Sequence, residues 1–156
     1  MKPREYLFIL IVTSVLALGL AACSSGTPTG PLGAPIDLRP RLPADVRARA
    51  PADTDWGKFQ TAQTQIKVGV PAATIAIVWK YFKDGARSYL LDVSFQVLAP
   101  AEGIELSAAT EGAPIYTGSM QALRVVVTWS RASALGTQSG TASGMILADG
   151  RWELAQ

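Results

Sequence analysis

The stretch Arg87-Ser-Tyr-Leu-Leu-Asp-Val-Ser-Phe-Gln-Val97 decides the fold class of this chain. Apolar and polar residues alternate along it with a period of two, which sorts them onto the two faces of a strand, whereas a helix would scatter them around its circumference. The predicted apolar face carries Tyr89, Leu91, Val93, Phe95 and Val97, and the predicted polar face carries Ser88, Asp92, Ser94 and Gln96. The stretch therefore predicts a β-strand with one buried face.

The residues immediately before this stretch predict the strand that pairs with it. Ile75, Ile77, Trp79 and Tyr81 alternate in the same way. Lys83-Asp84-Gly85-Ala86 lies between the two runs. Because Asp-Gly tolerates the positive φ angles of a tight turn, the two runs are predicted to form a β-hairpin.

Further alternating runs follow towards the end of the sequence. Leu123, Val125, Val127 and Trp129 form one predicted face, and the runs 140–148 and 151–155 flank a second Asp-Gly turn at residues 149–150. Val70-Pro71 separates a run at 64–69 from one at 74–82, and weaker strands are predicted at 104–107 and 115–117. We therefore predict an all-β domain, a small immunoglobulin-like β-sandwich of about six to eight strands, although the Cys-Trp-Cys pattern of true immunoglobulin domains is absent.

A second fold is kept as the alternative. The closing stretch Gly144-Met-Ile-Leu-Ala-Asp-Gly-Arg-Trp-Glu-Leu154 resembles the last hairpin of cystatin-like cone domains, the relatives of nuclear transport factor two. The resemblance implies an α+β cone in which a curved sheet packs on preceding helices. In this sequence, only residues 54–63 offer such a helix, and it would be short.

The first 23 residues have the layout of an export signal. Lys2 and Arg4 precede a 15-residue apolar run, Tyr6–Leu20, and Leu20-Ala21-Ala22 leads to Cys23, the single cysteine. As a helix, this run would span about 22 Å, which is short of the roughly 30 Å hydrocarbon core of a bilayer.

With a cysteine directly after the cut, this layout resembles the lipobox of bacterial lipoprotein precursors. The resemblance implies cleavage before Cys23 and lipid attachment to its thiol. It further implies location in the cell envelope, and in the outer membrane if the cell has two membranes, because Ser24 rather than aspartate follows the cysteine.

Three regions follow from this reading: a signal peptide at 1–22, a lipidated tether at 23–52 and a β-rich globular domain at 53–156. The tether is predicted because residues 24–52 contain six prolines and three glycines, a composition that disfavours both helices and strand ladders.

Composition limits the chemistry of the domain. It carries eight Lys and Arg against nine Asp and Glu, so no basic surface for nucleic acid is expected. The sequence contains no histidine, which excludes imidazole metal ligands and histidine-based catalytic triads. Asp84 and Asp149 are interpreted as turn residues. We therefore predict no enzymatic activity, no catalytic residue, no metal and no cofactor.

Aromatic residues are the remaining candidates for binding. Trp79, Trp129 and Trp152 occupy apolar strand positions and are predicted to lie in the core, whereas Trp56 lies outside the predicted strands. Trp56 and Tyr116 are therefore the candidate binding residues. The other face of 74–82 also carries apolar residues, Ala76, Val78 and Phe82, which predicts that a helix, a loop or another protein covers it.

The function expected from these features is that of a lipid-anchored envelope protein. Its β domain would bind another protein or support an envelope assembly, and addition of a strand to an open sheet edge is one route. The alternative is a lipoprotein that binds a small ligand such as a lipid, a glycan or a peptide.

Overall fold

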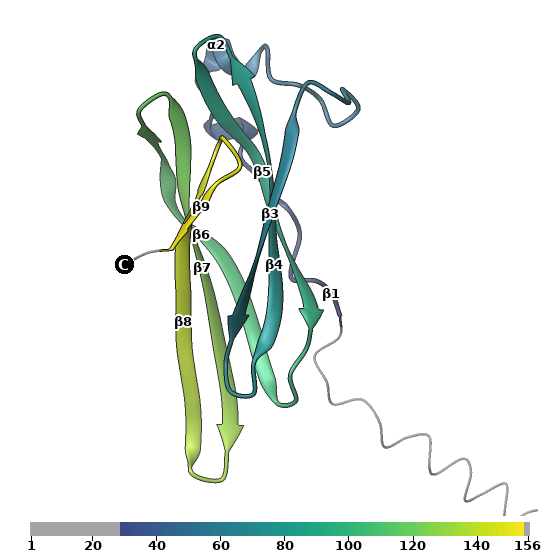
Figure 1. Ribbon diagram of the computed structural model, residues 1–156, viewed down its shortest axis with the longest axis vertical. Coiled ribbons are helices and arrows are strands. Elements are labelled where there is room, and N and C mark those ends of the chain that lie inside the picture. Colours follow the sequence, from purple (N-terminus) through teal and green to yellow (C-terminus); the bar gives the residue numbers. More distant parts are fainter. Residues whose placement is uncertain (1–28, 155–156) are drawn as a thin grey trace, which may run out of the picture.

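The computed structural model describes residues 29–154. Seven strands make up most of this part: β3 (Gln60–Val68), β4 (Ala73–Asp84), β5 (Arg87–Ala99), β6 (Ile104–Thr117), β7 (Met120–Ser133), β8 (Gly136–Leu147) and β9 (Trp152–Leu154). Before them lie the short strands β1 (Gly30–Pro31) and β2 (Ile36–Asp37), the 3-10 helix η1 (Arg39–Arg41) and the one-turn helix α2 (Ala44–Arg47) (Figure 1). The prediction of an all-β fold is confirmed.

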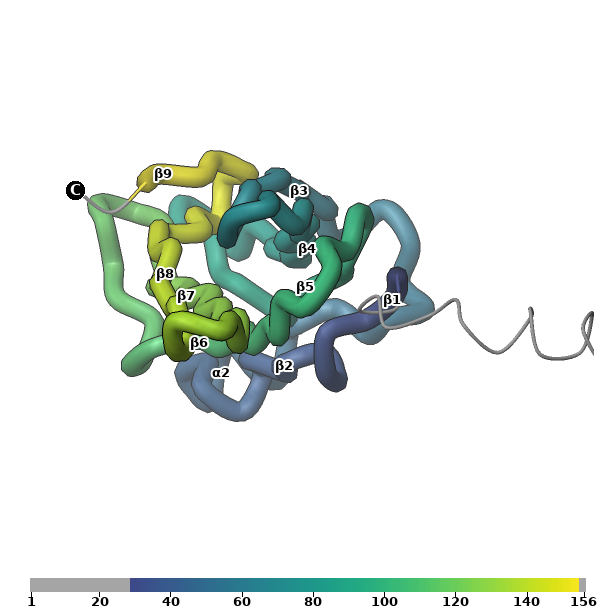
Figure 2. The backbone as a smooth tube through the Cα atoms, turned by 90° about the horizontal axis from the view of Figure 1, so that it is seen from below, coloured from purple at the N-terminus to yellow at the C-terminus, as the bar shows by residue number. Residues whose placement is uncertain are grey.

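All nine described strands belong to one hydrogen-bonded sheet that curls on itself (Figure 2). Its order is β3-β4-β5-β7-β8-β9. Outside this order, β6 pairs with β7, and β1 and β2 pair with β5. The strands β5 and β7 meet at a single parallel pair, Ser88 and Met120. The helix that a cone fold would need at 54–63 is not formed, because residues 60–63 belong to β3.

Both predicted Asp-Gly hairpins are present, with small differences in their turns. In the first, Asp84 pairs with Arg87, so the two-residue loop is Gly85-Ala86, and Gly85 alone has a positive φ, of 61°. In the second, the Leu147 N–H donates to the Arg151 carbonyl, and Gly150 has a φ of 90°. Glycine accepts these left-handed conformations without the steric cost that a Cβ would add.

The core lies between the two arms of the curled sheet. Trp79 is completely buried there, and its indole Nε1 donates a 2.9 Å hydrogen bond to the Leu147 carbonyl on β8. Trp129 and Trp152 are half-buried and lie over glycines: a Cβ on Gly140 would come within 2.7 Å of Trp129 Nε1, and one on Gly144 would overlap the Trp152 ring. Each of these two tryptophans thus covers a strand position that only glycine can occupy without rearrangement.

A bulge in β5 changes which residues face this core. Lys80 pairs with Asp92, but the next residue, Tyr81, pairs with Leu90, so Leu91 is an extra residue on β5. One extra residue reverses the alternation of a strand. Leu90 therefore joins Trp79 in the core.

Tyr89 and Leu91 consequently lie on the opposite face of the sheet, with Phe82. The prediction that they share a face with Val93, Phe95 and Val97 is wrong. The sequence pattern does not reveal the bulge, because Leu90 and Leu91 are both apolar and either one could face the core.

The second face is covered by the segment that was predicted to be a tether. Leu42 and Val46, at η1 and α2, pack against Phe82, Tyr89 and Leu91. This cover comes from the chain itself and shields Phe82, one of the three apolar residues expected on the second face of β4.

The same segment also extends the sheet and enters the core. Gly30 pairs with Val97 and Ile36 with Val93, the Leu38 N–H donates to the Leu91 carbonyl at 2.8 Å, and the Leu38 side chain is only 1% exposed. The expected tether up to residue 52 is therefore corrected: from residue 30 onward the chain is part of the folded body.

The prolines of this segment do not prevent its folding, because they occupy positions where proline is tolerated. Pro40 lies in the first turn of η1, and Pro43 directly precedes α2. Each buried Leu or Val side chain contributes about 1.5–3 kcal/mol. The ion pairs that accompany them, Arg39–Asp53 and Arg49–Asp84, contribute little to stability, because water screens the charges. Apolar burial therefore dominates the attachment of the segment.

Candidate binding surface

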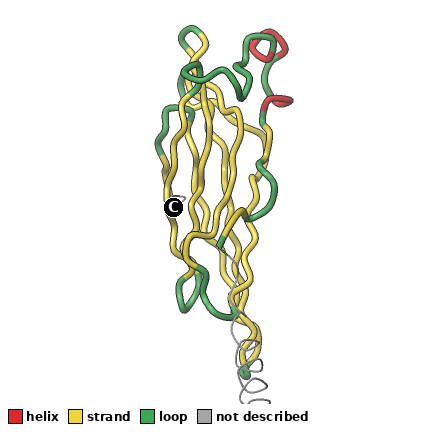
Figure 3. Tube along the Cα trace, turned by 90° about the vertical axis from the view of Figure 1, so that its right-hand side faces the viewer, coloured by secondary structure: helices red, strands yellow, loops and turns green. Residues whose placement is uncertain are grey.

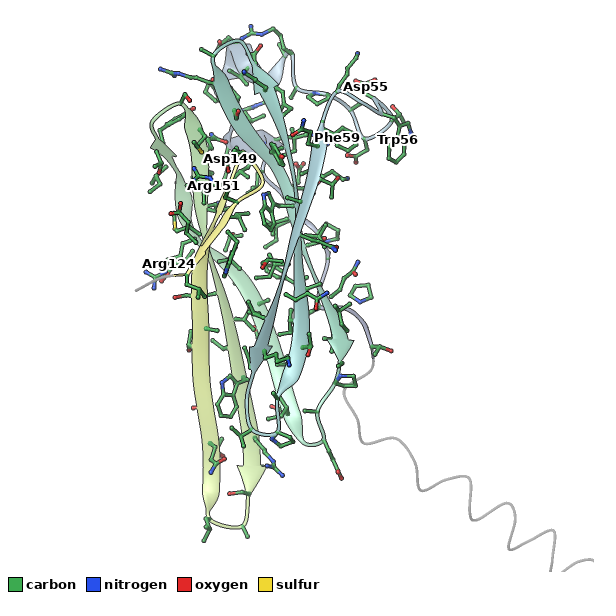
Figure 4. All side chains as sticks on the ribbon, in the orientation of Figure 1. Asp55, Trp56, Phe59, Arg124, Asp149 and Arg151 are labelled. Atoms are coloured by element: carbon green, nitrogen blue, oxygen red, sulfur yellow. The ribbon has the colours of Figure 1, made fainter. Side chains whose placement is uncertain are left out.

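The body is elongated, and its two ends differ. The chain enters at β1, beside the end of β5, whereas both short helices and the loop before β3 lie at the far end (Figures 1 and 3). Trp56 belongs to this loop (Figure 4). The strongest candidate for a binding residue is thus placed at the end remote from the entry of the chain.

Hydrogen bonds hold the Trp56 loop in shape. The Asp55 carboxylate accepts a 3.0 Å hydrogen bond from the Ala52 N–H, and the Asp55 N–H donates to the Ala52 carbonyl at 2.9 Å. The Lys58 N–H then donates to the Asp55 carbonyl at 3.1 Å. The loop therefore presents Trp56 in a defined position, with 83% of the residue exposed to solvent.

Phe59 connects Trp56 to the body. The two ring centroids lie 6.0 Å apart at an interplanar angle of 44°, and Phe59 packs against the cluster that contains Phe82. The Lys80 ammonium lies 5.4 Å from the Phe59 ring centroid and 3.2 Å from an Asp92 carboxylate oxygen. Trp56 and Phe59 together form an aromatic surface on a supported base, which we call the aromatic tip.

Tyr116, the other candidate, lies on β6 and is partly exposed. Its ring meets the Tyr89 ring edge-on, with centroids 6.3 Å apart, and the Arg87 guanidinium lies 5.4 Å from the Tyr116 ring centroid. Tyr89 in turn contacts Phe82 in the same cluster on which Phe59 packs. Trp56 and Tyr116 therefore contact one apolar cluster through different neighbours, Trp56 through Phe59 and Tyr116 through Tyr89.

A hollow with a volume of about 390 Å³ adjoins the aromatic tip. Its lining includes Phe59, Tyr81, Lys83 and Asp149. A hollow of this size lies within the range of small-ligand sites. Sequence reasoning missed Phe59 and this hollow, because the hollow forms only where the β3–β4 arm and the β8–β9 turn approach each other.

The two turn aspartates are structural groups. The Arg49 guanidinium hydrogen-bonds to Asp84 at 2.7 Å and lowers the pKa of that carboxyl. Partial burial would raise the pKa of Asp149, but hydrogen bonds from the Arg151 N–H and guanidinium outweigh it and lower the pKa. Both carboxylates are therefore charged and paired at neutral pH, which suits turn residues better than a proton donor.

An open strand edge lies away from the aromatic tip. Residues 136–147 of β8 pair with β7, whereas β9 covers only Gly144–Ile146 on the other side. Within the part of the chain that the structure describes, no strand pairs with that outer edge at 136–143. Strand addition there is geometrically possible, but the edge is rich in Gly, Ser and Thr and offers few side-chain anchors.

Other features of the described residues bear on chemistry and location. Cys23 lies outside residues 29–154, so its environment is not part of this structure. Among the described side chains, no group of three or more His, Cys, Asp or Glu is placed to hold a metal ion. No helix in residues 29–154 has the length and apolar character needed to cross a bilayer.

Comparison with known proteins gives no family assignment. The chain matches no protein-family model, no curated protein and no solved structure.

Proposed function

We propose that this chain is a lipid-anchored protein of the cell envelope whose β domain binds another protein through the aromatic tip. The observation that carries the proposal is the 83% exposure of Trp56 on a loop held by two backbone–backbone hydrogen bonds and by one hydrogen bond from the Ala52 N–H to the Asp55 carboxylate. No catalytic role is proposed for any residue.

Two properties of Trp56 favour binding: the free-energy cost of exposing its apolar ring to water and the rigidity of its loop. Tryptophan is favoured as the central anchor of protein interfaces because its large ring buries much apolar surface on contact. A side chain that is already positioned loses less conformational entropy on binding than a mobile one. Trp56 is 83% exposed, hydrogen bonds hold the backbone of its loop, and its ring contacts Phe59. It lies at the end remote from β1, where a partner can approach.

The aromatic tip predicts a specific mutational result. We expect Trp56→Ala to reduce capture of the partner by about tenfold or more, the scale of an interface anchor, without reducing the stability of the domain. Crosslinking in intact cells followed by co-purification measures the loss.

Leu154→Ala is the matched control, because Leu154 is also a large exposed apolar residue but lies on β9. It is expected to leave capture unchanged. Equal capture of the same proteins by Trp56→Ala and the parent would contradict the role of the aromatic tip.

The anchor is supported by the residues before the described body. Lys2 and Arg4, the apolar run and Leu20-Ala21-Ala22-Cys23 match the lipobox layout, so the mature chain is proposed to begin at a diacylglyceryl-modified Cys23. Two or three acyl chains give stable membrane attachment, whereas one gives only marginal attachment. Mass spectrometry of the mature amino terminus tests the anchor, and an unmodified Cys23 or a different first residue would refute it.

The hollow beside Phe59 supports a second candidate function, the binding of a small ligand. Phe59 and Tyr81 would supply apolar contact, while Lys83 and Asp149 would supply charges of opposite sign. A ligand that binds only the folded state raises the midpoint of thermal unfolding in a dose-dependent manner. Screening lipids, glycans and peptides for such a shift tests this function separately from protein capture.

A further inference from the structure

The end of the body at which the chain enters carries exposed apolar side chains on three neighbouring segments. Val70 lies in the β3–β4 turn and is 69% exposed, Leu98 lies near the end of β5, and Leu135 lies at the tip of the β7–β8 hairpin and is fully exposed. We call this surface the apolar end; the β7–β8 hairpin projects furthest from it (Figure 1).

Strand pairing and one hydrogen bond hold these segments together. Thr74 pairs with Ala99, which places the β3–β4 turn beside the end of β5, and Gly30 pairs with Val97 on the same strand. The Arg131 guanidinium on β7 donates to the Val70 carbonyl at 2.9 Å and links the hairpin to the β3–β4 turn. The entry of the chain is therefore next to the apolar end.

Charge is distributed unequally between the two ends. The segments 69–73, 97–103 and 131–138 contain two charged residues, Glu102 and Arg131. At the far end, the segments 39–58 and 83–87 contain many charges of both signs: Arg39, Arg41, Asp45, Arg47, Arg49, Asp53, Asp55, Lys58, Lys83, Asp84 and Arg87. An exposed apolar surface with so few charges is suited to a low-dielectric surface such as a lipid interface.

Chain length limits which end can approach the membrane. Cys23 precedes Gly30 by seven residues, which span at most about 25 Å when fully extended. Gly30 pairs with Val97, which lies ten residues along β5 from Arg87 at the charged end, a separation of roughly 33 Å that exceeds the length of this connection. An anchored body cannot turn over to bring its charged end to the bilayer, because Gly30 would then lie farther from the membrane than the connection allows.

We infer that the apolar end rests on the bilayer that holds the lipidated Cys23, with Leu135, Leu98 and Val70 in the interfacial region. The inference depends on the proposed anchor and adds an orientation to it. The body stands on the membrane by its apolar end, and the aromatic tip faces away from the lipid.

The inference is tested by the depth of single labels on the acylated mature protein in vesicles of phosphatidylethanolamine and phosphatidylglycerol. Leu135→Cys carries an environment-sensitive fluorophore, and Thr117→Cys, an exposed position at the far end, carries it as the control. The acylated Cys23 has no free thiol to react.

The label at Leu135→Cys is expected to be quenched by nitroxide-bearing lipid and protected from aqueous iodide, and the label at Thr117→Cys is expected to show the reverse. Adding Leu135→Asp to a protein labelled at Leu98→Cys should increase iodide quenching several-fold. Because Leu135 is fully exposed, this change leaves folding intact.

Three outcomes would overturn the inference. A chain that is acylated and floats with the vesicles, but whose Leu135→Cys label is quenched by iodide as strongly as the Thr117→Cys label, refutes the orientation and leaves the anchor standing. Protection from both quenchers identifies a protein contact, such as a second copy of the chain, in place of lipid. An unacylated Cys23 overturns the anchor and the orientation together.

Discussion

Replacing Trp79 with alanine is expected to lower the free energy of unfolding by about 4 kcal/mol, because a large aromatic side chain leaves a cavity that the surrounding core can fill only in part. Trp79 is completely buried between the two arms of the sheet, where it packs with residues of β5, β7 and β8. Its indole also donates the 2.9 Å hydrogen bond to the Leu147 carbonyl, which the alanine variant loses. Urea unfolding followed by circular dichroism measures the change.

Trp56→Ala is the matched control for this prediction, since it removes the same side chain from an exposed position. It is expected to change the free energy of unfolding by about 0.5 kcal/mol or less. Trp79→Phe should fall between the two, because the ring is retained in part while the hydrogen bond is lost. Similar stabilities for Trp79→Ala and Trp56→Ala would show that the arms of the sheet do not close around Trp79.

Leu38→Asp is expected to destabilise the domain by about 4 kcal/mol or more, because it removes a buried apolar side chain and places an unpaired carboxylate in the core. A residue of a passive tether would show no such effect. Leu38 is 1% exposed, packs in the same cluster as Trp79, and donates its N–H to the Leu91 carbonyl at 2.8 Å. Thermal and urea unfolding of the mature protein measure the loss.

Leu38→Ala, with an expected loss of about 3 kcal/mol, provides a measurable value if Leu38→Asp fails to fold. Leu154→Asp is the control, because Leu154 is largely exposed on β9 and is expected to tolerate the charge within about 0.5 kcal/mol. If Leu38→Asp and Leu154→Asp have the same stability, residues 30–50 are not an integral part of the folded body. The prediction that this segment is a tether would then be correct.

The strands were the most predictable part of this chain, because alternation and turn residues act over a few positions. Ile75, Ile77, Trp79 and Tyr81 form one face of β4 as predicted, and the two Asp-Gly pairs mark the β4–β5 and β8–β9 turns. The sequence predicted only two short strands, at 104–107 and 115–117, whereas residues 104–117 form one long strand, β6. Its Ala, Gly and Pro content obscures the pattern. Pairing with β7 over 104–111 and 115–117, on either side of an irregularity, compensates for the low intrinsic strand propensity.

The candidate binding surface was predictable only in part. Trp56 was identified because it lies outside any alternating run, and its exposure agrees with that reasoning. Phe59 and the adjoining hollow could not be identified, because they depend on how the β3–β4 arm, the Trp56 loop and the β8–β9 turn are placed relative to one another. The sequence also could not show that Trp56 and Tyr116 have different neighbours, because this depends on the same placement of distant segments.

The amino-acid sequence alone determined the all-β class, the hairpins and the absence of histidine chemistry, because these depend on composition and on short-range periodicity. Only the tertiary structure decided that Leu91 leaves the core at a bulge and that the proline-rich segment folds over the second face of the sheet. Both depend on contacts between residues far apart in the chain. Leu42 and Val46 bury their side chains against Phe82, Tyr89 and Leu91, and these three residues share a face only because β4 pairs with β5 and β5 contains the bulge.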